Sequence, residues 1–521
     1  MLVLSPGLVA AVELEAGSVL YRGVSAKNGA VQAFLGVPFA QPPFGGLRWQ
    51  PPLELASLPR SIDARSYKPA CAQGPHMVAW YRDVVSSFGG NPDSFTTPQT
   101  SEDCLYLNIW KPADIGESSL PVIVFIHGGS NKGGWSYEPN YIGENLAHRG
   151  AVVVTIPYRV GVLGFFSHPE QALSNFGLLD QIAALTWLQE NISDFGGDPG
   201  NVTVMGESAG ANDIVFLMVS PLAQGLFQRA VLQSGGWSYN GRGSRQEQLS
   251  STAALQQTLL GEQGNLDALR NIPVDELLAG AATVLSGHSF EPVIDGHSLL
   301  EPIARSMQSG RFRPVDLLIG SNADEWLMYL DEKQSVAGWL EENLEPGQVA
   351  AARAALPATL EESRRLDRLI TADAFVCPSM AIAQRVAEHG GRSWFYYFTR
   401  QREGEKGAQM GAYHGAELPY VFDTHDDWLP TTSADRELTQ TIMQYWLNFA
   451  RSGDPNGAGL PPWAPFVRER GLVQQLDEVS LGVVHPSLSL CNVLLPVDAV
   501  RPFVAVGPLE KNRIIERGAK P

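Results

Sequence analysis

Short apolar segments alternate along this chain with longer segments of mixed polarity. Runs of β-branched, aliphatic and aromatic residues predict buried strands at 122–126, 152–156, 201–205, 229–232, 317–319 and 394–398. Two longer segments predict helices. Residues 178–192 carry apolar side chains near one side, and residues 437–450 end before a Gly-Asp-Pro stop signal. Strands that alternate with helices predict an α/β fold whose sheet has helices on both faces.

Two regions interrupt this alternation, at about 240–315 and about 331–392. Both lack strong strand patterns and have helical character, so we expect them to be helical insertions that cover one end of the sheet. The chain has no low-complexity linker and no repeat of fixed period. We therefore expect residues 1–521 to form a single catalytic domain.

Composition narrows the class of protein. The 521 residues carry a formal net charge of −18, which argues against a nucleic-acid partner because such proteins need a basic surface. No apolar run approaches the length that spans a bilayer. The first 17 residues carry no Lys or Arg and contain Pro6-Gly7, so they form a poor signal peptide. That absence favours the cytoplasm, whereas pairing of the cysteines would favour a secreted or periplasmic protein.

The chain has four cysteines, and none lies in a metal-binding arrangement. No CxxC pair and no zinc-like Cys/His spacing is present, so we predict no metal site. Four cysteines allow three pairings, and all four can also remain reduced. Their positions are Cys71, Cys104, Cys377 and Cys491.

A glycine-flanked serine follows the predicted strand at 201–205. The segment reads Gly206-Glu207-Ser208-Ala209-Gly210 and continues into small and apolar residues that can form a helix. A strand, a sharp Gly-x-Ser-x-Gly turn and a helix together are typical of a nucleophile elbow, which holds the serine hydroxyl above the edge of the sheet. Bulky residues at 206 or 210 would collide with neighbouring backbone. Ser208 is thus the candidate nucleophile, and we expect Glu207 to form hydrogen bonds within the scaffold rather than act on substrate.

An acyl-transfer serine also needs backbone donors for the oxyanion. The turn His127-Gly128-Gly129-Ser130 directly follows the strand at 122–126, where a βα loop brings N–H groups beside the elbow. The N–H of Ala209 is a second source of donors. We interpret His127 as a turn residue rather than a catalyst.

The acid and the base must follow the serine, because elbow-type hydrolases have the chain order serine, acid, histidine. Asp324 and Glu325 lie in a polar loop after the strand at 317–319, and spacing alone does not separate them. Among the downstream histidines, His414 has the most suitable place, in a Gly-flanked loop before an apolar segment. The others are His389, His425 and His485.

Several long motifs, in order along nearly the whole chain, resemble the type-B carboxylesterase family, which includes cholinesterases and bacterial para-nitrobenzyl esterases. Residues 34–43 and 47–49 match the family's N-terminal signature, and residues 102–110 match its second signature. Residues 195–203 match the family's segment that leads into the elbow. The resemblance implies an α/β-hydrolase fold, with a central, mostly parallel mixed sheet, helices on both faces and helical insertions over the active site.

The resemblance also implies residue roles. It makes Ser208 the nucleophile, Glu325 the acid and His414 the base. The oxyanion donors would be the N–H groups of Gly129, Ser130 and Ala209, and Ser234 would support the triad from behind. The resemblance also implies two disulfides, Cys71–Cys104 and Cys377–Cys491. The chain departs from the family at Ser130, where glycine or alanine is usual, and at Trp326, where glycine is common.

The sequence therefore predicts a serine carboxylesterase that acts on small-molecule esters and needs no cofactor. An amidase or carbamate hydrolase with the same triad, and a non-catalytic binding module on the same scaffold, are the alternatives. Aromatic loop residues that could line its pocket are Trp80, Tyr81, Trp135, Trp237 and Tyr239. Neither the natural ester nor the oligomeric state follows from the sequence.

Overall fold

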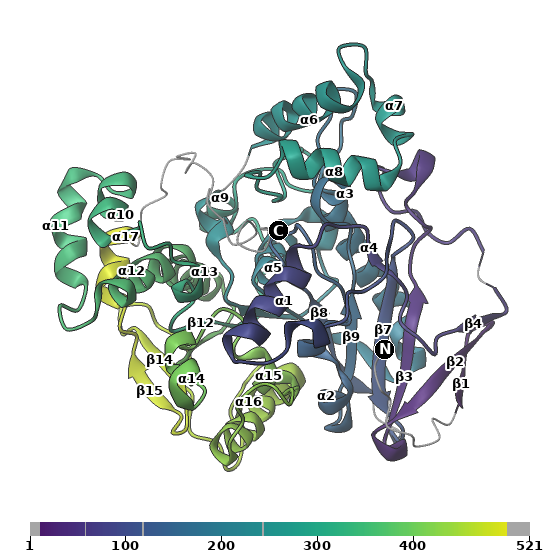
Figure 1. Ribbon diagram of the computed structural model, residues 1–521. Helices are drawn as coiled ribbons and strands as arrows, with labels where there is room; N and C mark the ends of the chain where they lie inside the picture. The colour runs from purple at the N-terminus through teal and green to yellow at the C-terminus, as the bar shows by residue number, and fades with distance from the viewer. Residues whose placement is uncertain (1–10, 58, 117–118, 242–243, 497–521) are drawn as a thin grey trace.

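A twisted sheet of thirteen strands forms the centre of the molecule in the computed structural model, which describes residues 11–57, 59–116, 119–241 and 244–496 (Figure 1). Its strands are β1 (Ala11–Ala16), β2 (Val19–Ala26), β3 (Val31–Pro38), β4 (Ser61–Asp63), β7 (Tyr106–Pro112), β8 (Leu120–Ile126), β9 (Val152–Ile156), β10 (Gly197–Glu207), β11 (Arg229–Gln233), β12 (Asp316–Asn322), β13 (Ser393–Phe398), β14 (Leu472–Leu476) and β15 (Leu481–Val484). Two short strands, β5 (Ala70–Cys71) and β6 (Thr100–Ser101), pair separately.

The sheet is mixed, with a parallel centre. Its order is β1-β2-β3-β7-β9-β8-β10-β11-β12-β13-β14-β15, and β4 pairs with β2. Every pair from β9 to β14 is parallel, whereas the pairs from β1 to β9 and the pair β14-β15 are antiparallel. The six strands predicted from the sequence are six of the seven consecutive parallel strands, β9 to β13 in the sheet order, and the seventh, β14, was not predicted. Sequence reasoning missed the antiparallel strands at both edges.

Side chains alternate between two cores on the two faces of the sheet, as strand geometry requires. Along β8, Val122, Val124 and Ile126 belong to the core on one face, whereas Ile123 and Phe125 belong to the core on the other. The first core includes residues of α4 (Phe176–Asn191), α5 (Ala209–Val219) and α13 (Cys377–Glu388). The second includes α2 (Glu144–His148), α15 (Leu418–Phe422) and α16 (Ser433–Ser452). The predicted arrangement of helices on both faces is therefore present.

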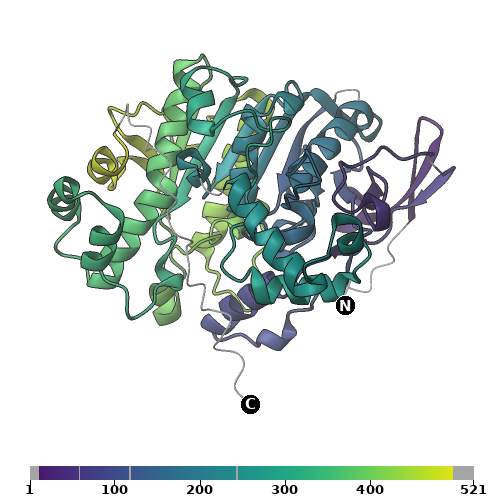
Figure 2. The same cartoon turned by 90° about the horizontal axis from the view of Figure 1, so that it is seen from above.

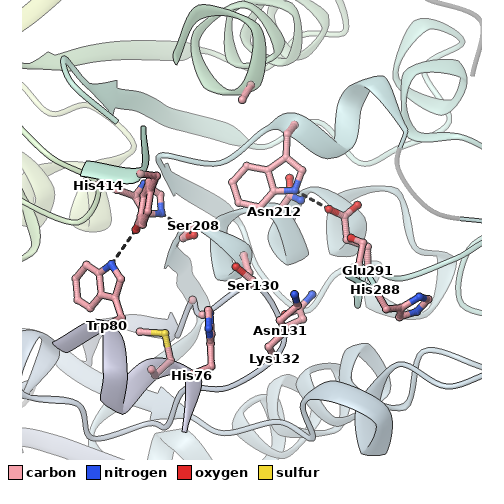
Figure 3. Close-up of a pocket in the computed structure, with 18 of the residues that line it drawn as sticks. His76, Trp80, Ser130, Asn131, Lys132, Ser208, Asn212, His288, Glu291 and His414 are labelled. Carbon is pink, nitrogen blue, oxygen red and sulfur yellow. Dashed lines mark hydrogen bonds between the residues drawn. The ribbon is translucent and has the colours of Figure 1, made fainter. Parts of the chain in front are cut away.

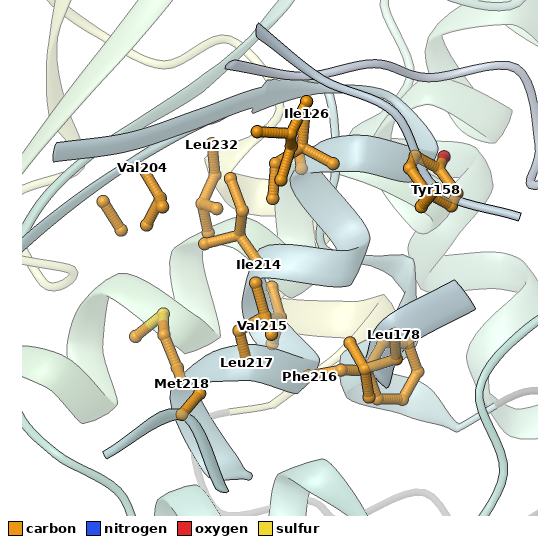
Figure 4. Packing of buried hydrophobic residues seen from close by; sticks show 14 of the residues in the cluster. Ile126, Tyr158, Leu178, Val204, Ile214, Val215, Phe216, Leu217, Met218 and Leu232 are labelled. Atoms are coloured by element: carbon orange, nitrogen blue, oxygen red, sulfur yellow. The ribbon is translucent and has the colours of Figure 1, made fainter. Parts of the chain in front are cut away.

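The α5 helix is buried on nearly all sides, which explains its apolar sequence. Ile214 and Leu217 of this helix pack in the same core as Ile126, Val204 and Leu232 of three adjacent strands (Figure 4). A helix held this firmly fixes the position of its first residue, Ala209, and of the serine before it.

The first expected insertion, 240–315, is helical. It contains α6 (Arg245–Leu260), α7 (Leu266–Arg270), α8 (Val274–Val284) and α9 (Ile303–Gln308). Helices α6, α7 and α8 gather at one end of the molecule (Figures 1 and 2).

The second region, 331–392, differs in part from the expectation. Helices α10 (Val336–Asn343), α11 (Pro346–Ala355) and α12 (Glu362–Thr371) lie beside the sheet with α17 (Leu488–Leu494), and the π-helical segment Ala372–Val376 leads into α13 (Figure 1). Helix α13 is no cover, because it packs directly against β12 and β13. Its apolar face, including Met380 and Ile382, is part of the core.

Two disulfides join distant parts of the chain. Cys71–Cys104 closes a loop that contains α1 (His76–Ser87), and Cys377–Cys491 links α13 to α17. These are the two pairs that the resemblance implied.

The remaining α-helices are α3 (Gly161–Gly164) and α14 (Gly404–Met410). Within the described ranges, no helix is both long enough and apolar enough to cross a membrane.

Candidate active site

Ser208 occupies a sharp turn between β10, which ends at Glu207, and α5, which begins at Ala209. Its backbone has φ 56° and ψ −123°, a conformation that is strained for a residue with a side chain. Glycine is required on either side of the turn. A Cβ atom at Gly210 would lie 2.1 Å from the carbonyl oxygen of Ile126, and one at Gly206 would lie 2.6 Å from the carbonyl carbon of Gly210. The predicted elbow is thus present.

Three side chains from distant parts of the chain form one hydrogen-bonded series. The Ser208 Oγ lies 2.8 Å from the Nε2 of His414, and the Nδ1 of His414 lies 2.6 Å from the Oε2 of Glu325. The other oxygen of Glu325 accepts a hydrogen bond of 2.6 Å from the N–H of Asn322. Glu325 is fully buried, so its carboxylate has one fixed orientation.

The structure separates the two acidic candidates that spacing could not. Asp324 turns away from His414. One of its oxygens lies 2.5 Å from Arg364, and the other accepts a hydrogen bond from the N–H of Ala412. Asp324 therefore anchors the backbone that leads to His414, whereas Glu325 contacts the imidazole directly.

The other downstream histidines lie in packing environments away from Ser208. His389 contacts the ring of Phe312, His425 is hydrogen-bonded to Thr439, and His485 contacts Tyr397. Burial lowers the pKa of His425 and His485 to about 3.

Three residues with backbone N–H groups that are unpaired in the described chain line the cavity beside Ser208. Gly129, Ser130 and Ala209 all line it, and in the described parts of the chain their N–H groups donate no hydrogen bond. Gly129 and Ser130 have φ of 96° and 56°, so this loop has a left-handed backbone at two successive residues. Ser130 adopts this left-handed conformation with a side chain present.

The loop is held from behind by a buried polar network. The Asn131 side chain donates a hydrogen bond to Asp213, and Tyr158 donates one to the Oδ1 of Asn131. His127 stacks on Tyr158 and burial lowers its pKa to about 4. His127 is a neutral packing residue of this turn.

Glu207 lies closer to the reaction centre than its sequence context indicates. Its Oε1 is 3.3 Å from the Nε2 of His414, and in the described part of the chain this oxygen has no hydrogen-bond partner. The expected scaffold hydrogen bonds of Glu207 are absent among the described residues, and its carboxylate faces His414 instead. Sequence reasoning missed this contact because Glu207 and His414 come from elements 207 positions apart.

The electrostatics of His414 follow from this ring of carboxylates. Burial lowers the pKa of His414, but Glu207, the hydrogen bond to Glu325 and the charges of Glu325 and Glu417 raise it more, to about 9. Burial raises the pKa of Glu207 to about 8, an effect that His414 opposes. His414 and Glu207 thus form a coupled pair that titrates above neutral pH.

The site opens into a cavity of about 760 Å³ (Figure 3). Aromatic side chains line the part nearest to His414. The Nε1 of Trp80 donates a hydrogen bond of 2.8 Å to the hydroxyl of Tyr329, and Phe375 contacts both His414 and Trp326. Of the aromatic candidates from the sequence, Trp80, Tyr81 and Trp237 line the cavity; Trp135 and Tyr239 do not.

A family model described as the carboxylesterase family matches residues 9–481 of this chain. The chain belongs to the carboxylesterase family. It is 34% identical over 499 residues to the human cocaine esterase, covering 89% of this chain and 87% of the relative. It is also 34% identical over 517 residues to the liver carboxylesterase of Sus scrofa, covering 89% and 88%.

Solved structures agree with this assignment. A structure of PNB esterase superimposes with a TM-score of 0.79 at 31% identity, covering 93% of this chain and 99% of that one. The expected α/β-hydrolase fold is confirmed. The enzyme is thus a carboxylic-ester hydrolase, a serine hydrolase by family.

Two further expectations concern this carboxylesterase's site. Ser234 is fully buried behind the elbow, and within the described ranges its Oγ forms no hydrogen bond with His414 or Glu325. Trp326 lines the cavity beside Phe375, and its N–H donates a hydrogen bond to the carboxylate of Asp367. Sequence reasoning missed Tyr329 and Phe375, which lie in segments without any motif.

Proposed function

We propose that this carboxylesterase hydrolyses esters through an acyl-enzyme on Ser208, with His414 as the base and Glu325 as the acid of the triad. The observation that carries the proposal is the unbroken series of hydrogen bonds Ser208–His414–Glu325 beside unpaired backbone donors. Each role requires a contact that these side chains already make.

The first half of the reaction acylates the serine. The Ser208 Oγ attacks the ester carbonyl carbon while its proton passes to the Nε2 of His414, and Glu325 stabilises the resulting imidazolium. The carbonyl oxygen becomes an oxyanion, which the N–H groups of Gly129, Ser130 and Ala209 bind. The C–O bond to the alcohol then breaks, and the alcohol leaves with the proton of His414.

The second half releases the acid. Water takes the place of the alcohol, His414 accepts one of its protons, and the oxygen of the water attacks the acyl carbon. The bond to Ser208 breaks, the hydroxyl regains its proton and the carboxylic acid leaves. No redox step and no further reactant is needed.

Replacement of the nucleophile tests the mechanism. We expect Ser208→Ala to lose at least about 10³-fold in kcat for p-nitrophenyl acetate, because the oxyanion donors and binding alone remain. A fluorophosphonate probe should label the native enzyme at Ser208 and leave the variant unlabelled. Full hydrolysis by Ser208→Ala would rule out the acyl-enzyme.

The same geometry suits amides and carbamates, whose hydrolysis needs the same donors and base. Values of kcat/KM for a matched ester, amide and carbamate decide among them, and we expect the ester to be preferred. A folded enzyme that hydrolyses none of the three and reacts with no probe would favour the binding-module alternative.

A further inference from the structure

Lys132 lines the catalytic cavity. Lys132 follows the proposed oxyanion donors Gly129 and Ser130 in the same loop, and its N–H donates a hydrogen bond to the carbonyl of Gly129. Figure 3 shows Lys132 with Asn131 beneath Ser130, with His76 on one side and His288 on the other. A ligand that reaches Lys132 is therefore within the same cavity as Ser208.

Lys132 has no partner among the described residues. Its ammonium group forms neither a hydrogen bond nor an ion pair there, although the side chain is only partly exposed. Asn131 beside it is committed to Asp213. Because burial of an unpaired cation is costly, a ligand that brings a negative charge gains more here than at an exposed lysine.

The neighbours of Lys132 add hydrogen-bond donors without adding charge. Burial and, next, the charge of Lys132 lower the pKa of His76 and of His288 to about 4, so both imidazoles are neutral at neutral pH. His288 is fixed by a contact of 3.0 Å between its Nδ1 and the Oγ of Ser251. Helix α1 begins at His76 with no side-chain cap, so its positive end also faces this region.

Five carboxylates among the described residues line the cavity, and no hydrogen bond or ion pair joins any of them to Lys132; they are Asp83, Glu138, Glu207, Glu247 and Glu291. Glu138 accepts hydrogen bonds from Tyr81 and the N–H of Trp135, and Glu291 accepts one from Trp237. Glu247 closes the capping box of α6, and Glu207 faces His414. Burial raises the pKa of Glu138 to about 7 and that of Glu207 to about 8, which reduces their negative charge.

We propose that this cavity takes esters that carry a second, anionic group, and that Lys132 binds that group, a carboxylate, while Ser208 reacts with the ester. The inference rests on the proposed function and names its substrate class. Among the described residues that line the cavity, Lys132 is the one lysine or arginine, and one cation fits a monoanion such as a carboxylate better than a phosphate dianion. Lys132 is thus a specificity-determining residue for charge.

Two pairs of esters test the preference, one for each position of the charge. Monomethyl glutarate and dimethyl glutarate differ by a carboxylate on the acyl half. The second pair, 4-acetoxybenzoate and its methyl ester, differs by a carboxylate on the leaving group. In at least one pair, we expect Lys132→Met to lower the ratio of kcat/KM, anionic over neutral, by about 10- to 100-fold, since charged hydrogen bonds are strong.

Three further measurements separate charge recognition from a structural role. Lys132→Arg should keep most of the ratio, and Lys132→Glu should lower it further. Lys406→Met removes an exposed lysine of α14. Its ratio of kcat/KM, anionic over neutral ester, should equal that of the native enzyme. Raising the salt concentration from about 20 mM to about 500 mM should reduce the native ratio, because screening weakens ion pairing.

The outcomes are distinct. If the ratios of both pairs are the same in native enzyme and Lys132→Met, the inference is wrong, even though Ser208-dependent hydrolysis of the neutral esters continues. If no ester of either pair is hydrolysed, the proposed function itself fails. If circular dichroism shows that Lys132→Met does not fold, the same ratios of kcat/KM are measured for Lys132→Gln, and they test the inference in its place.

Discussion

At the scale of single residues, Glu325 and Asp324 are adjacent carboxylates with different partners. Glu325 contacts His414, whereas Asp324 pairs with Arg364. We expect Glu325→Gln to lower kcat by about 10³- to 10⁴-fold, because an amide cannot hold the same imidazole tautomer or stabilise its charge. Steady-state kinetics with p-nitrophenyl acetate measure the loss.

The neighbour provides the control for that change. Asp324→Asn alters the same charge one residue away, and we expect a much smaller loss in kcat accompanied by a lower melting temperature. Equal losses in the two variants would contradict the role of Glu325.

Glu207 gives a prediction about pH. Its carboxylate lies 3.3 Å from His414 and helps to raise the pKa of that imidazole to about 9. His414 must be neutral to accept the serine proton, so kcat/KM of the native enzyme should rise with pH between about 7 and 9. Glu207→Gln removes negative charge and should lower the pKa of His414. The rise of kcat/KM with pH, the acid limb of the profile, should therefore occur at lower pH.

The pH profile of kcat/KM over pH 5 to 10 measures the shift. Glu405→Gln removes a carboxylate at an exposed position of α14 that does not line the cavity, and it should leave the pH dependence of kcat/KM unchanged. An unmoved limb in Glu207→Gln would show that the contact does not set the titration of His414.

At the scale of elements, the elbow depends on the close approach of α5 to β8. A methyl group at Gly210 would lie 2.1 Å from the carbonyl oxygen of Ile126, and backbone cannot yield as a side chain tip can. We expect Gly210→Ala to lower the free energy of unfolding by roughly 1–3 kcal/mol or more and to displace Ser208. Denaturant unfolding and esterase activity should fall together.

Gly347→Ala is the matched control. Gly347 lies in α11 with open space around its Cβ position, and alanine favours helix more than glycine by about 1 kcal/mol. Its unfolding free energy should stay the same or rise slightly. Loss of stability at Gly347 equal to that at Gly210 would argue against the close approach as the cause.

A feature of this fold can be predicted from the sequence when the interactions that form it join residues close together in the chain. The six central strands and the elbow are encoded locally, by β-branched runs and by glycines at fixed spacing. The contacts of Glu207 and Tyr329 are not, because they depend on where the segments around 329 and 414 lie in space. Spacing left Asp324 and Glu325 equivalent for the same reason, and contacts with distant residues distinguish them: Asp324 pairs with Arg364 and Glu325 contacts His414.

The edges of the sheet were missed for a different reason. Strands such as β1, with half-exposed alternating residues, and β15, which is largely exposed, carry weak apolar patterns. Helix α13 was assigned to an insertion because its own sequence does not reveal that its partner is the sheet. The missed edge strands thus lack a strong local apolar pattern, whereas the position of α13 depends on strands that lie elsewhere in the chain.

At the scale of the whole molecule, we propose that the chain unfolds as one domain. The sheet runs without interruption from β1 to β15, and Cys377–Cys491 ties the second helical region to the C-terminal part. We expect a single thermal transition, with far-ultraviolet circular dichroism, tryptophan fluorescence and loss of activity coinciding. Two resolved transitions would show that one of the helical regions is an independent unit.

Ser208 and His414 are 206 positions apart in the chain, and this separation has a consequence during synthesis of the protein on the ribosome. The elbow emerges when β10 and α5 have been made, but its base is translated much later, after β12 and β13. Until then the nascent chain has a serine hydroxyl with no group to take its proton. The growing polypeptide is therefore expected to be catalytically silent, and a chain that terminates before residue 414 should fail to hydrolyse esters however well its first half folds.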